Sequence, residues 1–414
     1  RIYGSAKILD DVLQDDSVEQ LIRGAMLPGV VSPVMVMPDC HQGYSVPIGF
    51  VGATRVLDGV ISPGACGFDI NCGMRLLRSP YRYEEIASCL PKLADKIQEK
   101  IPSGLGRGRK EGKRFTATEI NNILALGSSY LVNSGFGEKN DLENCESGGK
   151  LDWADPVFVS REAQKRGKDQ VGTLGSGNHF LEIQKVERIF DEKTASCFGL
   201  FRDQVTVMIH CGSRGLGHQV CSDYLDILGS KQKKYGVEMP DKDFICVPFS
   251  SSEGRNYFAA MAAAANYAWA NRQMITYFLR KVWSKVLENK NPSLEVVYDV
   301  AHNIIKRAKY EINGQEEEVL VHRKGATRAF PPGHPEIPER YRETGQPVLI
   351  PGSMGTHSYV LAGEKSGLQS FYSTSHGAGR LMSRRQARRK FRGEQEVEKM
   401  RNKGISLRFA SKKG

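Results

Sequence analysis

Several features that mark other classes of protein are missing from this sequence. No run of eighteen apolar residues occurs among the 414 residues, so no transmembrane helix is expected. Neither a Walker A sequence nor a Gly-x-Gly-x-x-Gly loop after a strand is present, so neither of these phosphate-binding motifs is expected. No internal repeat is visible, and helical and strand patterns do not alternate regularly. This order argues against a Rossmann or TIM-barrel arrangement and predicts a mixed α+β fold.

Cysteine is present in an odd number, nine, at irregular spacing and never as a pair separated by two residues. A secreted disulfide framework is therefore not expected, and a reducing, cytoplasmic setting is the simpler interpretation. We interpret Cys89, Cys145, Cys197 and Cys246 as structural. Cys72 differs from them, because it lies three residues after an aspartate in a glycine-rich turn.

Acidic residues are outnumbered, since 58 lysines and arginines stand against 47 aspartates and glutamates, a net charge of +11. This excess favours a polyanionic partner, although charge alone fits a plain basic surface equally well. The distribution favours nucleic acid, because two of three basic clusters flank glycine-rich motifs. The clusters are Arg107, Arg109, Lys110, Lys113 and Arg114; Arg161, Lys165, Arg166 and Lys168; and residues 384–392.

Histidine is scarce, with nine residues in the chain, yet four of the nine lie in short polar motifs, most of them rich in glycine. An aspartate and a cysteine share a fifth motif. The five are Asp69-Ile70-Asn71-Cys72-Gly73, Gly175-Ser176-Gly177-Asn178-His179-Phe180, Ile209-His210-Cys211-Gly212-Ser213-Arg214-Gly215, Ala301-His302-Asn303 and Ser375-His376-Gly377-Ala378-Gly379-Arg380. Imidazole, carboxylate and thiolate bind first-row divalent metals, and glycine lets the backbone approach a ligand closely. The combination predicts a metal site beside a phosphate site.

Each motif taken alone has a simpler interpretation. A histidine beside glycine is more often a hydrogen-bonded turn residue than a metal ligand, and Asp69 and Cys72 fit a turn aspartate and a small buried thiol. Their common setting favours the metal site. An apolar run at 205–209 precedes His210, for example, so this side chain is expected at a strand end, where a rigid scaffold displays chemical groups.

Hydrophobic periodicity predicts the main elements. Helices are expected over residues 17–27, 83–100, 256–288 and 383–402. The longest of these carries an expected core stripe of Met261, Ala265, Ala268, Trp269 and Ile275. Strands are expected over residues 180–186, 206–209, 294–298, 317–322 and 348–350, and within residues 30–50, where three prolines are expected to interrupt them. Residues 133–152 are expected to form a loop or an insertion.

Five longer motifs occur in a fixed order, at residues 37–43, 64–75, 175–182, 351–355 and 375–380. In this set and order the chain resembles the RtcB family of RNA-splicing ligases, from Arg1 to Gly414. The resemblance implies one compact α+β domain over residues 1–414, with a long central helix and a basic surface. RtcB-like chains usually continue to a lysine that contacts the guanine nucleotide. The resemblance therefore also implies a sequence shortened at both ends, with GTP binding weakened.

The resemblance implies a pair of Mn²⁺ ions bridged by the thiolate of Cys72. The implied ligands are Asp69, Cys72, His179, His210 and His302. Five protein ligands are too many for one catalytic ion with an open position, but they suit two ions that share a bridge. The residue types alone fit Zn²⁺ equally well. We do not assign His41 as a ligand, and we interpret His218, His322 and His334 as surface or core histidines.

The resemblance also implies that His376 is the nucleophile that attacks the α-phosphorus of GTP. The residues expected at the GTP site are Asn178, His179, Phe180, Leu181, Glu182, His302, Asn303, Pro351, Gly352, Ser353, Met354, Ser358, His376, Gly377, Ala378 and Gly379. Guanidinium groups pair with phosphates bidentately. The arginines expected to bind RNA are Arg214, Arg380 and Arg384.

The implied activity is a GTP- and Mn²⁺-dependent RNA ligase, acting in tRNA splicing or RNA repair. It would join 2′,3′-cyclic phosphate or 3′-phosphate ends to 5′-hydroxyl ends through a GMP–histidine intermediate and 3′-end guanylylation. The expected partner is RNA, as tRNA halves or broken RNA; no membrane and no particular activating protein is indicated. Alternatives are a two-metal phosphodiesterase or phosphatase, which needs no nucleophilic His376, and an RNA chaperone, which needs no metal ligands.

Overall fold

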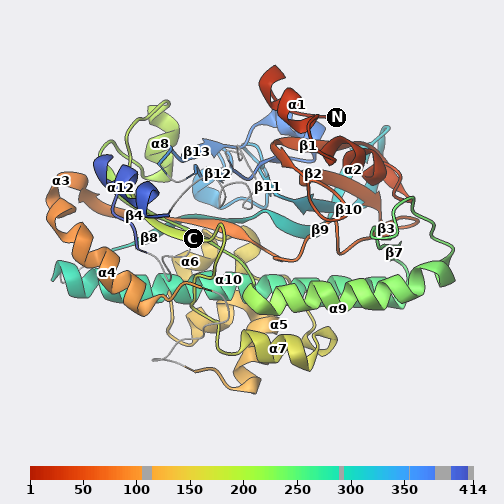
Figure 1. The fold of residues 1–414 in the computed structure, drawn as a ribbon, viewed down its shortest axis with the longest axis horizontal. Coiled ribbons are helices and arrows are strands. Elements are labelled where there is room, and N and C mark those ends of the chain that lie inside the picture. The colour runs from red at the N-terminus through yellow and green to blue at the C-terminus, as the bar shows by residue number, and fades with distance from the viewer. Residues whose placement is uncertain (105–113, 289–292, 354, 378–392, 409–414) are drawn as a thin grey trace.

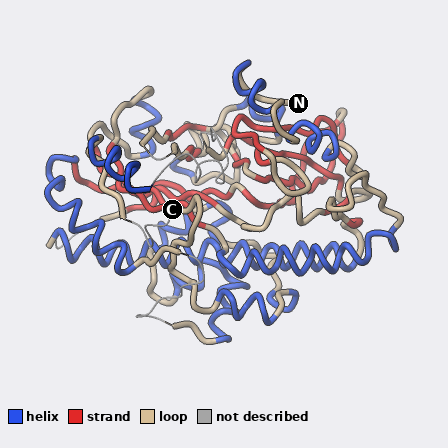
Figure 2. The backbone as a smooth tube through the Cα atoms, viewed as in Figure 1, coloured by secondary structure: helices blue, strands red, loops and turns tan. Residues whose placement is uncertain are grey.

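The computed structural model describes residues 1–104, 114–288, 293–353, 355–377 and 393–408. Strands occupy one layer of the molecule, and the two longest helices run beneath it (Figures 1 and 2). One antiparallel sheet has the order β1 (Val30–His41), β2 (Ile48–Arg55), β10 (Gln315–Lys324), β9 (Asn303–Ile312). The second has the order β5 (Phe180–Lys185), β6 (Gln204–Cys211), β4 (Gly73–Arg82), β8 (Glu295–Ala301). This antiparallel arrangement confirms the mixed α+β prediction.

Short strand pairs and helices complete the described part of the fold. The pairs are β3 (Val60–Ile61) with β7 (Val247–Pro248), β11 (Ala326–Arg328) with β14 (Ser373–Ser375), and β12 (Pro347–Ile350) with β13 (Tyr359–Ala362). The helices are α1 (Ala6–Val12), α2 (Ser17–Gly24), α3 (Tyr83–Ile86), α4 (Leu90–Lys100), α5 (Ala117–Asn133), α6 (Lys139–Glu143), α7 (Arg161–Gly167), α8 (Glu192–Phe198), α9 (Arg214–Gln232), α10 (Ser252–Leu287) and α12 (Gly393–Asn402). None of the described helices is both long and apolar enough to cross a membrane.

Helix α10 is the predicted long central helix. The hydroxyl of Ser251 caps it by accepting a hydrogen bond from the backbone N–H of Gly254 at 3.0 Å. A run of small alanine side chains lets α5 and α9 pack closely against it. All five residues of the predicted core stripe are fully buried, which confirms that prediction.

Antiparallel order brings four chain segments to one edge of the second sheet. β4 and β5 begin at this edge, and β6 and β8 end there. In the register, Gly73 pairs with both Cys211 and Ala301, and His210 pairs with Phe180. Residues just before β4 and β5, and just after β8, therefore converge on the end of β6.

A buried ion network fixes this edge to α10. Asp299 accepts from Arg75 Nε at 2.7 Å and from Arg272 Nη2 at 2.8 Å. Arg272 also donates to the backbone carbonyls of Asn71 at 2.9 Å and Cys211 at 2.7 Å. One α10 side chain thus holds both the turn before β4 and the end of β6.

Two local predictions were wrong in part. The predicted strand break at Pro47 is confirmed, since it lies between β1 and β2, but the breaks at Pro33 and Pro38 are not. β1 continues through Pro33 and Pro38, although its register is irregular near both. It is an edge strand, where proline removes no obligatory ladder hydrogen bond. Residues 133–152 are not a plain loop. They include α6 and the fully buried Glu146. The carboxylate of Glu146 pairs with Lys306 at 2.6 Å, which offsets the cost of burying its charge. Residues 383–392 of the last predicted helix lie outside the described residues.

Candidate active site

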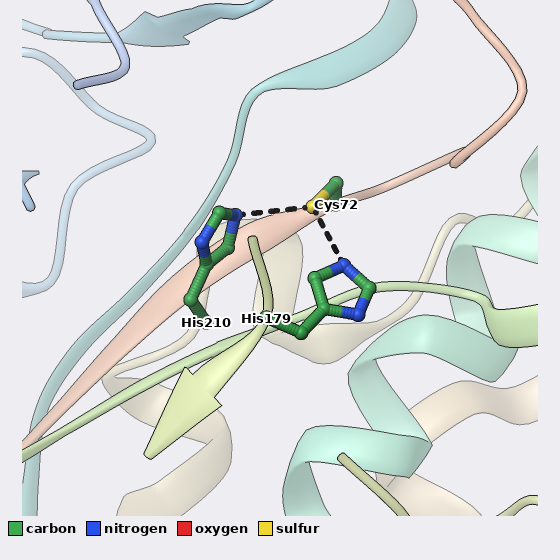
Figure 3. A group of neighbouring side chains, drawn as sticks. All are labelled: Cys72, His179 and His210. Carbon is green, nitrogen blue, oxygen red and sulfur yellow. Dashed lines mark hydrogen bonds between the residues drawn. The ribbon is translucent and has the colours of Figure 1, made fainter. Parts of the chain in front are cut away.

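Five donor atoms form a continuous row at the edge where β4, β5, β6 and β8 meet. Asp69 Oδ2 lies 2.8 Å from His179 Nε2, which lies 3.4 Å from Cys72 Sγ. On the other side, Cys72 Sγ lies 3.2 Å from His210 Nε2, which lies 3.4 Å from His302 Nε2. Figure 3 shows Cys72 between the two histidines that flank it. The structure thus brings together all five predicted ligands, with the thiol in the middle.

The local backbone is shaped to keep this row compact. A Cβ atom on Gly212 would lie 2.2 Å from Asp69 Oδ1, so any larger residue would displace the carboxylate. The side chain of Asn303 donates to the backbone carbonyl of Asp69 at 3.1 Å and accepts from the N–H of Gly325 at 2.8 Å. Asn303 therefore braces the turn that carries Asp69 and Cys72.

Ionisation within the row is coupled. Burial opposes the charge of His179, but the carboxylate of Asp69 at 2.8 Å outweighs it and raises the pKa of His179 well above its usual value, so a bound cation would take the place of this proton. Burial opposes ionisation of Asp69, but the neighbouring His179 outweighs it and lowers the pKa of Asp69 to about 2. Burial and then the neighbouring histidines hold the pKa of His210 and that of His302 well below the usual value, so both keep a free lone pair at neutral pH. Burial, and then the charge of Asp69, raises the pKa of Cys72 to about 12. A divalent cation would supply the positive charge that a buried thiolate needs.

His376 lies at the far end of the row from Asp69. It directly follows β14, and its ring centroid is 4.7 Å from that of His302. Gly325 leaves room for the His376 ring, because a Cβ atom at this position would lie 3.1 Å from His376 Cε1. Its φ of +66° also favours glycine over other residues. The predicted nucleophile is therefore adjacent to the predicted metal ligands.

Asp39 is a site residue that the sequence reasoning missed. Its Oδ2 lies 3.4 Å from His376 Nδ1, and its Oδ1 lies 3.5 Å from His41 Nδ1. The carboxylate is buried and faces both rings. The motif at residues 37–43 was the available signal, but nothing in the sequence indicates that it lies beside a residue more than 300 positions away.

Several predicted GTP-site residues form a hydrogen-bonded group between β5 and the loop residues Gly352 and Ser358. Gln184 Nε2 donates to Glu182 Oε2 at 2.8 Å and to Ser358 Oγ at 3.2 Å, and Ser358 Oγ accepts from the N–H of Gly352 at 3.0 Å. Burial raises the pKa of Glu182, and the Gln184 bond partly offsets this. Gln184 was missed, although it is two residues from Glu182 and so lies on the same face of β5.

The remaining predicted residues are distributed around this group. The ring of Phe180 contacts that of His210 at a centroid distance of 5.4 Å, and Leu181 packs against the main core. A Cβ on Gly377 would lie 2.8 Å from Asp39 Oδ2 and 3.9 Å from the carbonyl of Pro351, so these loops are close. Asn178 precedes His179, and Ser353 is exposed. The predicted residues that lie outside the described residues are Met354, Ala378, Gly379, Arg380 and Arg384.

Arg214, at the start of α9, is close to the row. A Cβ atom built on Gly175 would lie within 3 Å of the Arg214 guanidinium and 2.7 Å from His179 Nδ1. The guanidinium is therefore close to the ring of His179. Nε donates to Thr173 Oγ1 at 3.1 Å, and Nη2 donates to the carbonyl of Gly104 at 3.3 Å. These bonds hold a positive charge beside the Asp69 end of the row.

Three further histidines lie outside the row. His322 is buried beside the Ser62 backbone, and burial lowers its pKa to about 4. His334 stacks on Phe330 with a centroid distance of 3.5 Å, and His218 is exposed. All nine cysteines are free.

Comparison with known proteins gives a consistent result. A family model described as tRNA-splicing ligase RtcB matches residues 20–414. The tRNA-splicing ligase RtcB of Thermococcus kodakarensis is 50% identical over 415 residues, covering 99% of this chain and 86% of that protein. The proteins of the same name from Archaeoglobus fulgidus and Aeropyrum pernix are 50% and 49% identical, covering 98% and 99% of this chain and 84% and 86% of their own lengths. The chain therefore belongs to the RtcB family of tRNA-splicing ligases.

Proposed function

We propose that this protein is an RNA ligase that uses GTP and Mn²⁺ to join 3′-phosphate or 2′,3′-cyclic phosphate ends to 5′-hydroxyl ends. Its substrates in this proposal are tRNA halves or broken RNA. The observation that carries the proposal is the placement of His376 beside one end of a row of five side chains of the types that bind metals. In the same proposal residues 1–414 act as one ligase domain, since one apolar cluster combines residues from Ile61 to Leu320.

The order of the row supports two ions that share the thiolate. Asp69, His179 and Cys72 would hold one ion, and Cys72, His210 and His302 would hold the other. Such ions neutralise charge on phosphate oxygens and on leaving groups. The choice of manganese comes from the family resemblance, because the donor set also suits zinc.

His376 would be the nucleophile, and Asp39 would position it. Asp39 lies 3.4 Å from Nδ1 and would favour a proton on that nitrogen, which leaves the lone pair on Nε2 to attack the α-phosphorus of GTP. A phosphorus–nitrogen bond forms, and the bond to pyrophosphate breaks. An oxygen of the RNA 3′-phosphate then attacks the same phosphorus, which releases His376 and leaves GMP on the RNA.

The last step joins the two strands. The 5′-hydroxyl oxygen attacks the phosphorus of the activated 3′-phosphate, loses its proton, and displaces GMP to form a 3′,5′-phosphodiester. A cyclic phosphate must first be opened by water to a 3′-phosphate. Arg214, Arg380 and Arg384 are proposed to bind RNA phosphates around this site.

Glu182 is proposed to select guanine. A carboxylate accepts two parallel hydrogen bonds from the Watson–Crick edge of guanine, which offers two adjacent N–H donors, whereas adenine does not. Gln184 and Ser358 hold this carboxylate in place. The other predicted GTP-site residues are proposed to enclose the nucleotide from the neighbouring loops.

A joining assay tests the proposal. The protein is incubated with Mn²⁺, GTP, a 3′-phosphate RNA and a 5′-hydroxyl RNA, and the joined product is measured. Cys72→Ala should lower the joining rate by at least about 100-fold, because it removes the shared ligand. Cys89→Ala, a cysteine outside the row, is the matched control and should join normally. Cleavage of RNA in place of joining would instead support a two-metal phosphodiesterase, and joining that needs no GTP would contradict the proposed guanylylation.

A further inference from the structure

Three aromatic rings, called here the ring stack, lie in series beside the donor row; His218 and Phe68 are stacked, and Tyr44 is tilted by 57° against Phe68. His218, on α9, lies against Phe68 with a centroid distance of 4.9 Å and an interplanar angle of 29°. Phe68 in turn contacts Tyr44 at 5.5 Å. His218 is exposed, whereas Phe68 and Tyr44 are partly buried. This ring stack therefore presents its outermost ring to solvent.

The ring stack lies at the Asp69 end of the row. Phe68 directly precedes Asp69, and the backbone N–H of Ser213, at the start of α9, donates to Asp69 Oδ1 at 3.2 Å. His376 lies at the opposite end, beside His302. The two ends of the row thus differ in what surrounds them.

Exposed cations lie next to the ring stack. Helix α7 packs against α9, as Figure 1 shows, and Arg166 Nη1 donates to Gln219 Oε1 at 2.6 Å, one residue from His218. Asp223, a carboxylate that Gln219 also contacts, is already hydrogen-bonded by Ser160 and Gln219 at 2.6 Å each. Four exposed side chains in or directly after α7 form no ion pair with any described carboxylate; they are Arg161, Lys165, Arg166 and Lys168.

We propose that the ring stack binds a nucleobase near the 5′ end of the RNA strand that carries the 5′-hydroxyl, and that the α7 cations bind phosphates of the same strand. Aromatic faces beside a basic surface are how proteins hold single-stranded RNA. The strand assignment rests on the proposed function. The attacking and leaving oxygens lie roughly in line in a phosphoryl transfer. Since GMP leaves from the His376 end, the 5′-hydroxyl approaches from the Asp69 end.

The joining rate, measured against the concentration of the 5′-hydroxyl strand, tests this proposal. His218→Ala should raise the half-saturating concentration about tenfold, within the range for loss of one base stack. Guanylylation of the 3′-phosphate strand, measured without the 5′-hydroxyl strand, should proceed at the wild-type rate. His218→Phe should restore the half-saturating concentration, because it keeps an aromatic face. Melting temperatures of the variants check that the fold is retained.

A second arm removes the base in place of the protein ring. An abasic site at one of the first three positions of the 5′-hydroxyl strand should raise the half-saturating concentration of the wild type by about the same factor. It should leave that of His218→Ala almost unchanged. The double substitution Lys165→Glu/Arg166→Glu should also raise the half-saturating concentration. The matched control is Lys233→Glu/Lys234→Glu at the other end of α9, which should not.

The outcomes separate the two proposals. If the wild type neither guanylylates nor joins RNA, the proposed ligase function fails. If it does both but His218→Ala joins with an unchanged half-saturating concentration, only the ring stack proposal fails. The ring stack proposal also fails if the abasic site and His218→Ala raise the half-saturating concentration additively. It fails too if His218→Ala slows guanylylation and joining equally. An effect confined to the 3′-phosphate strand overturns the strand assignment.

Discussion

Glu146 shows how a single buried charge supports the site. Its Oε1 lies 2.6 Å from Lys306 Nζ and 3.7 Å from Arg328 Nε, and its Oε2 accepts from the backbone N–H of Ala301 at 2.8 Å. Ala301 directly precedes His302, so Glu146 fixes the backbone beside a proposed ligand. Burial opposes ionisation, but the two cations outweigh it and lower the pKa of Glu146 to about 2.

This lowered pKa predicts a pH-dependent stability. The unfolded-state value is near 4.5, so the stabilisation is complete above pH 4.5 and is lost as pH falls toward 2. Glu146→Gln should lower the free energy of unfolding by roughly 3 kcal/mol at pH 7. The difference between variant and wild type should shrink between pH 4.5 and 2, as measured by urea unfolding at several pH values.

The exposed pair between Glu316 and Lys309 provides the control for this measurement. Glu316→Gln should change the stability by less than about 1 kcal/mol at any pH in this range. If Glu146→Gln lowers the free energy of unfolding by the same amount at pH 7 and at pH 3, the acid-sensitive charge is not that of Glu146.

The residues of the row and His376 could be predicted because metal and phosphate chemistry use few residue types, which here lie in short polar motifs. Asp39 and Glu146 could not. Their roles depend on contacts with His376 and Lys306, which are distant in sequence, and a lone carboxylate carries no local sign of such a partner.

At the scale of elements, α10 supports the site through Arg272. Its guanidinium joins Asp299 to the turn at Asn71 and to the end of β6. The length of α10 was predictable from its apolar and alanine-rich pattern. The course of β1 through its prolines was not, because whether a strand lies at a sheet edge depends on pairing that the sequence does not display.

Arg272→Met should destabilise the protein by roughly 3 kcal/mol, because it leaves part of a buried ion network unpaired while Arg75 still neutralises Asp299. It should also weaken Mn²⁺ binding by about 10-fold or more, since the turn that carries Asp69 and Cys72 loses its support. Urea unfolding and electron paramagnetic resonance of free Mn²⁺ measure the two effects.

Arg255→Met, at an exposed position on the same helix, is the control and should change neither quantity appreciably. If Arg272→Met binds Mn²⁺ with wild-type affinity, α10 does not position the donor row through this side chain.

At the scale of the whole molecule, the +11 net charge and the exposed cations of α7 favour a polyanion. If about six phosphates of a single strand are contacted, RNA affinity should fall roughly 300-fold between 50 and 200 mM salt. Fluorescence anisotropy with a labelled RNA measures this dependence. An affinity that is flat over this range would contradict a role for the positive charge in RNA binding.

The central claim is that His376 carries GMP during the reaction, and labelling with GTP that is radioactive at the α-phosphate tests it most directly. In the presence of Mn²⁺ the wild type should acquire label in an acid-labile, alkali-stable bond, as a phosphoramidate requires. His334→Ala, a histidine outside the row and stacked on Phe330, should label like the wild type. His376→Ala should acquire no label. Undiminished labelling of His376→Ala would contradict the account.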